Sequence, residues 1–142
     1  MTQRETMKKF KLLILALLLA SAAVAGETFG AVAPNMSQNV AGGGVTAKVT
    51  YLNPKSPDEP RFQVVLDTHS VNLDIYDLKT ISLLRDDAGN TYPATTVENK
   101  GSGHHRETTV SFAKVASGTK RVELLIKDVA GVKERIFRWD LE

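Results

Sequence analysis

The residues best suited to chemistry in this sequence are its three histidines, which lie in two short segments. One segment is Asp67-Thr68-His69-Ser70, and the other is Gly103-His104-His105-Arg106. Neutral imidazole and carboxylate groups are the usual protein ligands of Zn²⁺ and Cu²⁺. The two segments therefore predict a Cu(II) or Zn(II) site whose ligands are His69 with His104 or His105, completed by Asp67 or Asp74.

Strand geometry brings these segments together. Asp67 and His69 are two residues apart, so they point to the same side of an extended backbone. His104 and His105 are adjacent and diverge unless their glycine-flanked loop turns both inward. In an antiparallel sandwich successive loops alternate between the two ends, so the loops after the second, fourth and sixth predicted strands share one pole. Besides the histidines, those loops carry Asp67, Asp74, Asp77 and Asp128.

A structural reading of the same residues stays open. A His-His pair in a Gly-rich loop is typical of solvated surface. His69 can order a strand end through a hydrogen bond, and Asp67 can bind backbone amides in an Asx-turn. In that interpretation the segment from Asp67 to Ser70 ties down a long loop and holds no metal.

Other chemistries are less well supported. Cu⁺ lacks soft ligands, because there is no Cys and Met36 is the one Met after residue 25. A Ca²⁺ site made of Asp67, Asp74 and Asp77 fits no EF-hand spacing. Ser70 beside His69 lacks a G-x-S-x-G elbow, so we expect no hydrolase and no enzyme.

The domain that contains these two segments is predicted to be all-β. Alternating apolar and polar residues predict half-buried strands, and Gly-rich turns separate them. The predicted strands are 45–50, 61–66, 81–85, 91–98, 108–112, 121–127 and 136–141; the helix-like stretch 72–79 is a connection. We expect an immunoglobulin-like, seven-stranded antiparallel β-sandwich, with a small closed barrel as the alternative. Phe137 and Trp139 are predicted core residues, and Arg106, Arg135 and Arg138 are predicted to pair with acidic loops on the surface.

The N-terminus has the features of a secretory leader. Basic residues precede the short apolar run 12–20, and Ala23-Val24-Ala25 matches a signal-peptidase site. We expect a signal peptide over 1–25, a flexible lead-in over 26–44 and a β-sandwich domain over 45–142. The protein is then periplasmic or extracellular and has no membrane span after cleavage; an uncleaved membrane anchor is the alternative.

The charge balance and the absence of cysteine exclude several classes of function and of site. Of 18 basic and 16 acidic residues, four basic and one acidic lie before residue 26. The mature part thus carries a net charge near −1, without the excess of basic residues that nucleic-acid binding requires. The absence of Cys excludes disulfides, thiolate metal sites and attachment of lipid to a cysteine.

Three stretches also carry a resemblance: DTHSVNLD (67–74), GHHRE (103–107) and IKDVAGVKERIFRWDL (126–141). They resemble an uncharacterised group of small exported prokaryotic β-sandwich proteins, whose segments read DTHSxxLD, GGHHR and a final strand ending near Phe-x-Trp. Ser102 stands where the second Gly of that pattern is expected. The resemblance implies no activity. It implies that Asp67, His69, Asp74, His104 and His105 belong to one recurrent module.

The sequence as a whole predicts an exported metal carrier or buffer rather than an enzyme. The alternative is a structural or protein-interaction module of the cell envelope, with an envelope protein as its partner and no metal.

Overall fold

The computed structural model of the protein describes residues 36–56 and 58–141. The predicted signal peptide over 1–25 lies outside the described residues. No helix in the described part combines the length and the apolar character needed to cross a bilayer.

Period-two alternation builds the strands that carry most of the core. β2 (Val45–Tyr51) buries every second side chain, and β3 (Arg61–Thr68) does the same from Phe62 onward. The remaining strands are β1 (Ser37–Gly42), β4 (Ser82–Asp86), β5 (Thr91–Ser102), β6 (His105–Phe112), β7 (Arg121–Val129) and β8 (Val132–Asp140). The 3₁₀ helix η1 (Leu73–Ile75) and the single-turn helix α2 (Leu78–Ile81) connect β3 to β4.

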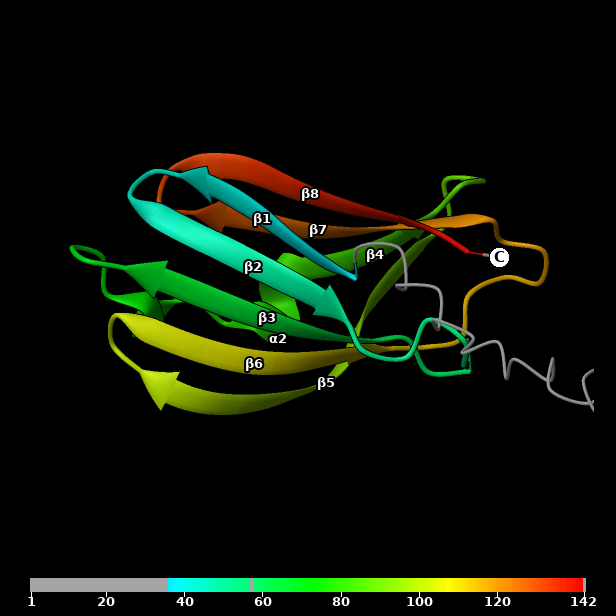
Figure 1. Ribbon diagram of the computed structural model, residues 1–142, viewed down its shortest axis with the longest axis horizontal. Helices are drawn as coiled ribbons and strands as arrows, with labels where there is room; N and C mark the ends of the chain where they lie inside the picture. Colours follow the sequence, from blue (N-terminus) through cyan, green and yellow to red (C-terminus); the bar gives the residue numbers. More distant parts are fainter. Residues whose placement is uncertain (1–35, 57, 142) are drawn as a thin grey trace, which may run out of the picture. The chain divides into compact units, whose positions relative to one another are not determined.

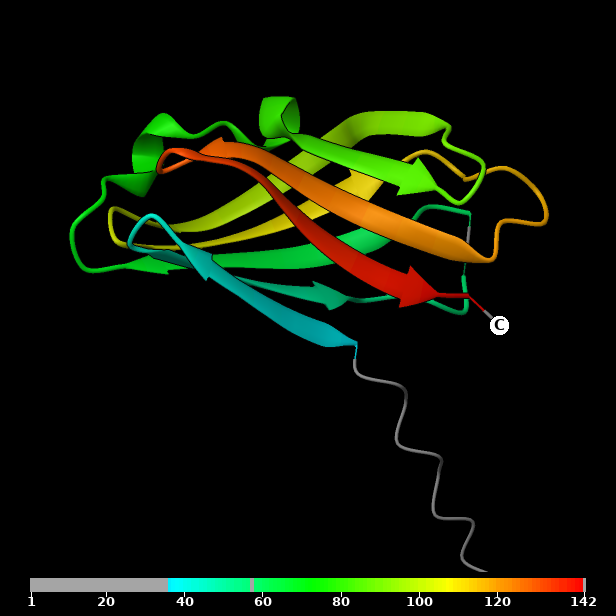
Figure 2. The same cartoon turned by 90° about the horizontal axis from the view of Figure 1, so that it is seen from above.

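All neighbouring strands are antiparallel, in the order β1-β2-β3-β6-β5-β4-β7-β8. The long strand β5 joins two layers: Thr91–Pro93 pairs with β4, and the part from Ala94 onward pairs with β6. The register shifts between Ala94 and Thr96, and such a bulge bends a strand from one layer toward the other. The sheet curls until its end strands β1 and β8 lie side by side (Figures 1 and 2), which makes a nearly closed barrel.

The all-β antiparallel prediction is confirmed, and the arrangement is nearer to the barrel that was kept as the alternative. The count of seven strands is wrong by one, because Ser37–Gly42 forms β1 inside the predicted flexible lead-in over 26–44. This strand was missed because none of its side chains is fully buried, so it lacks the alternating apolar pattern. It forms because the Gly43-Gly44 turn, with positive φ at both residues, folds it back onto the edge of β2.

Aromatic rings pack in the core near the end of the barrel where β2 and β8 end and β3 begins. Tyr51 stacks on Phe62 with ring centroids 4.4 Å apart, and Trp139 lies 5.1 Å from Phe62. Phe137 is fully buried and Trp139 is 4% exposed, so both predicted core residues are confirmed. This core holds the strand ends, and with them the polar loops, in fixed positions.

Candidate functional site

Four connections meet at one pole of the barrel, at the left of Figure 1: the β1–β2, β5–β6 and β7–β8 hairpins and the loop from β3 to η1. Contacts link them directly, since Ala130 N donates to Tyr76 Oη at 2.9 Å and Thr68 Oγ1 donates to Gly44 O at 2.7 Å. The predicted gathering of the histidine and aspartate loops at one end is therefore confirmed. We call this end, residues 42–45, 67–77, 102–106 and 128–132, the loop pole.

Asp67 and His105 form the central pair of the loop pole. They face each other across the β3–β6 ladder, and His105 Nδ1 donates to Asp67 Oδ1. Both side chains remain more than half exposed, at 54% for Asp67 and 61% for His105. Within the described residues His105 Nε2 makes no hydrogen bond, so this second ring nitrogen of an exposed side chain is available as a ligand.

Backbone and carboxylate contacts join the two predicted segments on either side of this pair. Thr68 N donates to His104 O at 3.0 Å, and Leu73 N donates to Gly103 O at 2.9 Å. The carboxylate of Asp74 accepts from Gly103 N at 2.9 Å. Asp74 thus holds the turn that carries His104, and its role is positional in this structure.

The loop after β3 is ordered mainly by Thr68 and Asn72. Thr68 Oγ1 accepts from Ser70 N and Val71 N, both at 3.2 Å. Asn72 Oδ1 accepts from Asp74 N at 3.0 Å and so begins η1. The Asx-turn that the structural interpretation placed at Asp67 is formed at Asn72, and the carboxylate of Asp67 binds His105 instead.

Arg106 is the residue that sequence reasoning placed wrongly. It was expected in surface ion pairs, but it is 7% exposed and points into the barrel. Its guanidinium donates to Leu73 O at 2.8 Å and Tyr76 O at 2.7 Å, and also to Asn99 Oδ1 at 2.8 Å. The signal was present in the alternation, since position 106 shares a face with the buried Thr108 and Val110.

Of the other two arginines predicted to lie on the surface, Arg135 is buried and Arg138 is exposed. Arg135 is 1% exposed and donates to Val129 O at 2.9 Å and Gly42 O at 2.7 Å, so the surface prediction is wrong for it. Burial lowers the pKa of its guanidinium from the ordinary value. Arg138 does lie on the surface and donates to Glu123 at 2.5 Å.

The five predicted metal ligands do not converge on one point. Within residues 36–56 and 58–141, no group of three or more His, Asp or Glu side chains is arranged to hold a metal ion. Asp67 and His105 are in direct contact, Asp74 binds a backbone amide, and His69 and His104 are exposed. The alternative Ca²⁺ site is not supported at Asp77, because the carboxylate of this residue caps α2. It accepts from Lys79 N at 3.1 Å and from Thr80 Oγ1 at 2.7 Å, and these hydrogen bonds lower its pKa.

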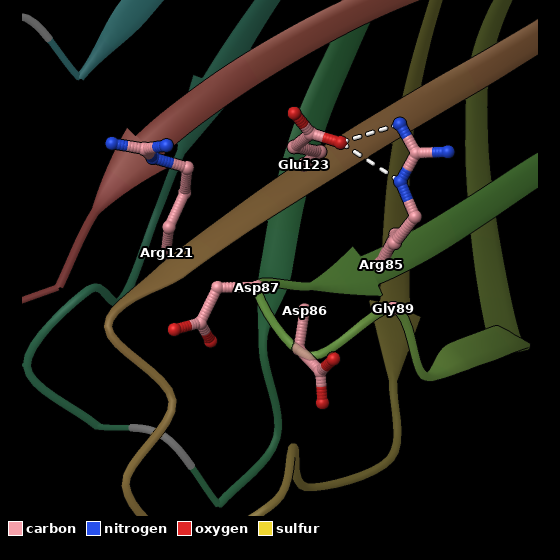
Figure 3. Close-up of a pocket in the computed structure, with 6 residues that line it drawn as sticks. All are labelled: Arg85, Asp86, Asp87, Gly89, Arg121 and Glu123. Carbon is pink, nitrogen blue, oxygen red and sulfur yellow. Dashed lines mark hydrogen bonds and ion pairs between the residues drawn. The ribbon is translucent and has the colours of Figure 1, made fainter.

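A second charged cluster, which sequence reasoning missed, lies at the opposite end of the barrel beside the β4–β5 turn. It lines a cavity of about 260 Å³ (Figure 3), and its charged residues are Arg85, Asp86, Asp87, Arg121 and Glu123. Glu123 accepts from Arg85 at 2.5 and 2.8 Å, and hydrogen bonds from Arg85 and Arg138 lower its pKa. Asp86 is buried and accepts from Asn90 and Tyr92, and the side chain of Asn90 is the main cause of its lowered pKa.

Glu123 and Asp86 are already committed to partners, so neither offers a free base. Asp86 accepts from Ala88 N and Asn90 N as well, and it therefore holds the β4–β5 turn closed. The loop pole, where imidazole nitrogens face solvent, remains the better candidate for binding.

Comparison with protein families, with curated proteins and with solved structures gave no significant match to this chain. The resemblance of the two polar segments to a group of exported proteins therefore stays a prediction. The geometry of the loop pole is the basis for assigning a function.

Proposed function

We propose that this protein is an exported, non-catalytic β-domain that binds Cu²⁺ or Zn²⁺ at its loop pole, as a carrier or buffer. The observation that carries the proposal is the Asp67–His105 pair. Histidine ligands of metals commonly donate their second ring N–H to a carboxylate, which fixes the ring and makes the free nitrogen a better ligand. His105 has this arrangement, with Nδ1 bonded to Asp67 and Nε2 without a hydrogen-bond partner among the described residues.

His69 and His104 supply the further ligands in this proposal. His104 directly precedes His105, and His69 is two residues after Asp67; Thr68 N donates to His104 O and so holds the two segments side by side. Both lie in exposed bends or turns, where side-chain rotation needs no change in the barrel. Ligand nitrogens at about 2.0–2.1 Å from Zn²⁺ would lie about 3–4 Å apart, within reach of such rotation.

Ordering these side chains limits the affinity. Each immobilised side chain costs about 0.5–1.5 kcal/mol, and two of the three imidazoles are not held in place. We therefore expect micromolar binding rather than the far tighter binding of a preformed structural site. In this account Asp67 orients a ligand, and Asp74 shapes the turn without contacting the metal.

The second candidate is a structural or protein-interaction module of the cell envelope. Thr68, Asp74 and Arg106 use their polar groups to rigidify the loop pole, and this network needs no metal. The two candidate functions assign different roles to the three histidines only, because both use the same polar network of the loop pole.

The deciding experiment is calorimetric titration of the purified full-length protein with Cu²⁺ and, separately, with Zn²⁺. The proposal expects one ion per chain, and at least about tenfold weaker binding in His105→Ala. Asp67→Asn should weaken binding by about 10–100-fold, as loss of an orienting partner does. Asp87→Asn, an exposed carboxylate at the opposite end, is the matched control and should bind as the parent does.

Weak binding that is equal in all four proteins would reject the metal proposal. The structural or interaction module would then be the working account.

A further inference from the structure

Side chains, rather than a backbone ladder, join β1 to β8 where the barrel closes. The carboxamide of Gln38 binds both backbone groups of Arg138: Arg138 N donates to Oε1 at 3.1 Å, and Nε2 donates to Arg138 O. Trp139 Nε1 donates to Met36 O at 3.2 Å, and Arg135 donates to Gly42 O. A side-chain amide thus stands where the peptide group of a paired strand would otherwise lie.

β1 is also the strand that is least anchored in the core. Among the described strands it alone has no fully buried residue, and only Met36 and Val40 pack partly against the core. Its one backbone ladder is with β2. Elements that bury little apolar surface open at lower free energy than the rest of a domain, so β1 is the first strand expected to detach.

The connection between β1 and β2 can act as a hinge. Gly42, Gly43 and Gly44 follow one another, and φ is +60° at Gly43 and +76° at Gly44 in the closed turn. Gly43 is tightly packed, since an added Cβ would lie 2.1 Å from Ala130 O. Glycine reaches extended conformations as readily as left-handed ones, so this turn can straighten without a side-chain penalty.

We propose that β1 exchanges between two copies of this chain, so that each copy closes the barrel of the other. The site that β1 leaves is bounded by the β2 edge, the Arg138 backbone, the Arg135 guanidinium and the Trp139 indole. The β1 strand of a second copy brings the same Gln38 amide and the same carbonyls of Met36 and Gly42. The hydrogen bonds that break when β1 detaches form again with the second copy. The equilibrium between closed monomer and exchanged dimer then depends on protein concentration.

A strand from an unrelated protein fits this site less well. It would need an amide side chain at the position of Gln38, opposite the backbone of Arg138. The second copy is therefore the occupant that these hydrogen bonds favour. This inference is independent of the metal proposal.

The absence of cysteine allows a clean test with two single variants, Gly42→Cys and Val132→Cys. A Cβ added at Gly42 would lie 3.0 Å from Val132 Cγ2, so thiols at these two positions meet across the β1–β8 junction. Gly42 does not have a positive φ, and a side chain there is compatible with the backbone. In closed monomers the two thiols are on separate molecules, and exchange alone brings them together.

The two full-length variants are mixed, held at low micromolar to millimolar concentration and then oxidised. Mass spectrometry measures the disulfide between residues 42 and 132. The control pairs Val132→Cys with Ser117→Cys, an exposed position at the other end of the barrel. At micromolar protein we expect at least about tenfold more heterodimer than in the control, because exchange holds the thiols at an effective concentration near millimolar or above.

The yield should also rise with protein concentration, and Trp139 fluorescence confirms that each variant is folded. In the double variant, an intrachain disulfide formed at high dilution should keep the protein monomeric in sedimentation at every concentration. A heterodimer yield equal to that of the control pair, with the parent monomeric throughout the range, would overturn the proposal.

Discussion

Arg106 is the side chain on which the shape of the loop pole depends most, and Arg106→Met tests that role. Methionine keeps an unbranched apolar stem in the barrel and removes the guanidinium. The carbonyls of Leu73 and Tyr76 lose their buried charged donor, and Asn99 keeps its bond from Thr108. The loop from β3 to α2 would then be held by its own turns, by Asp74 and by the two bonds that Leu73 N and Tyr76 Oη make to neighbouring loops.

The expected magnitude follows from those bonds. Hydrogen bonds from a charged donor contribute about 1.5–3 kcal/mol each, so the two to the loop carbonyls sum to about 3–6 kcal/mol. Removing a buried charge also removes its desolvation cost, which offsets part of the loss. We expect the free energy of unfolding to fall by about 3 kcal/mol, out of about 5–15 kcal/mol for a domain of this size.

Urea denaturation followed by Trp139 fluorescence measures this change, since Trp139 is the single tryptophan and is buried. With a slope of about 1–3 kcal/mol per molar urea, the midpoint should fall by about 1–3 M. The control is Arg61→Met. Arg61 is 43% exposed and lies 3.9 Å from Glu98, so its loss should cost less than about 1 kcal/mol. If the two midpoints move equally little, the guanidinium bonds do not hold the loop and the reasoning fails.

Two further predictions concern pH and export. Because hydrogen bonds lower the folded pKa of Asp86, its carboxylate stabilises the fold above the ordinary value of about 3.9, and this stability is lost as the pH falls through the lowered folded value. Urea midpoints measured from neutral to acid pH should therefore fall less steeply in Asp86→Asn; parallel curves would contradict this. In an exporting bacterial host, intact mass and N-terminal sequencing should find Gly26 as the first residue. A mature chain that retains residues 12–20 would show that the leader is not cleaved after Ala25.

The strands that the sequence predicted are those whose alternation reflects burial. β2 and β3 bury apolar residues on one face, and this pattern can be read without knowing their neighbours. β1 could not be found in this way, because its residues Ser37–Gly42 are small or polar and only partly buried. Its strand conformation comes from its partners: the β2 ladder and the hydrogen bonds of Gln38 with Arg138.

The loop pole was nevertheless predicted correctly, because the missed strand precedes all the counted ones. Adding β1 at the start moves every later connection by one, so loops expected at the same end still share an end. The hydrogen-bond partners of the buried cations could not be predicted in the same way. The alternation of β6 places Arg106 on its buried face, but the carbonyls that accept from its guanidinium are about thirty residues away in the chain, and no local pattern encodes that arrangement.

The two proposals meet at Thr68. Its hydroxyl donates to Gly44 O, so the segment that carries Asp67 and His69 also fixes the hinge before β2. A metal ion that orders His69 would strengthen this closed arrangement, whereas detachment of β1 straightens Gly43 and Gly44 and moves the carbonyl that Thr68 binds. Binding of an ion to the closed form alone stabilises it by mass action. If both proposals hold, metal binding at the loop pole should therefore oppose strand exchange, because the histidines and the hinge share one end of the barrel.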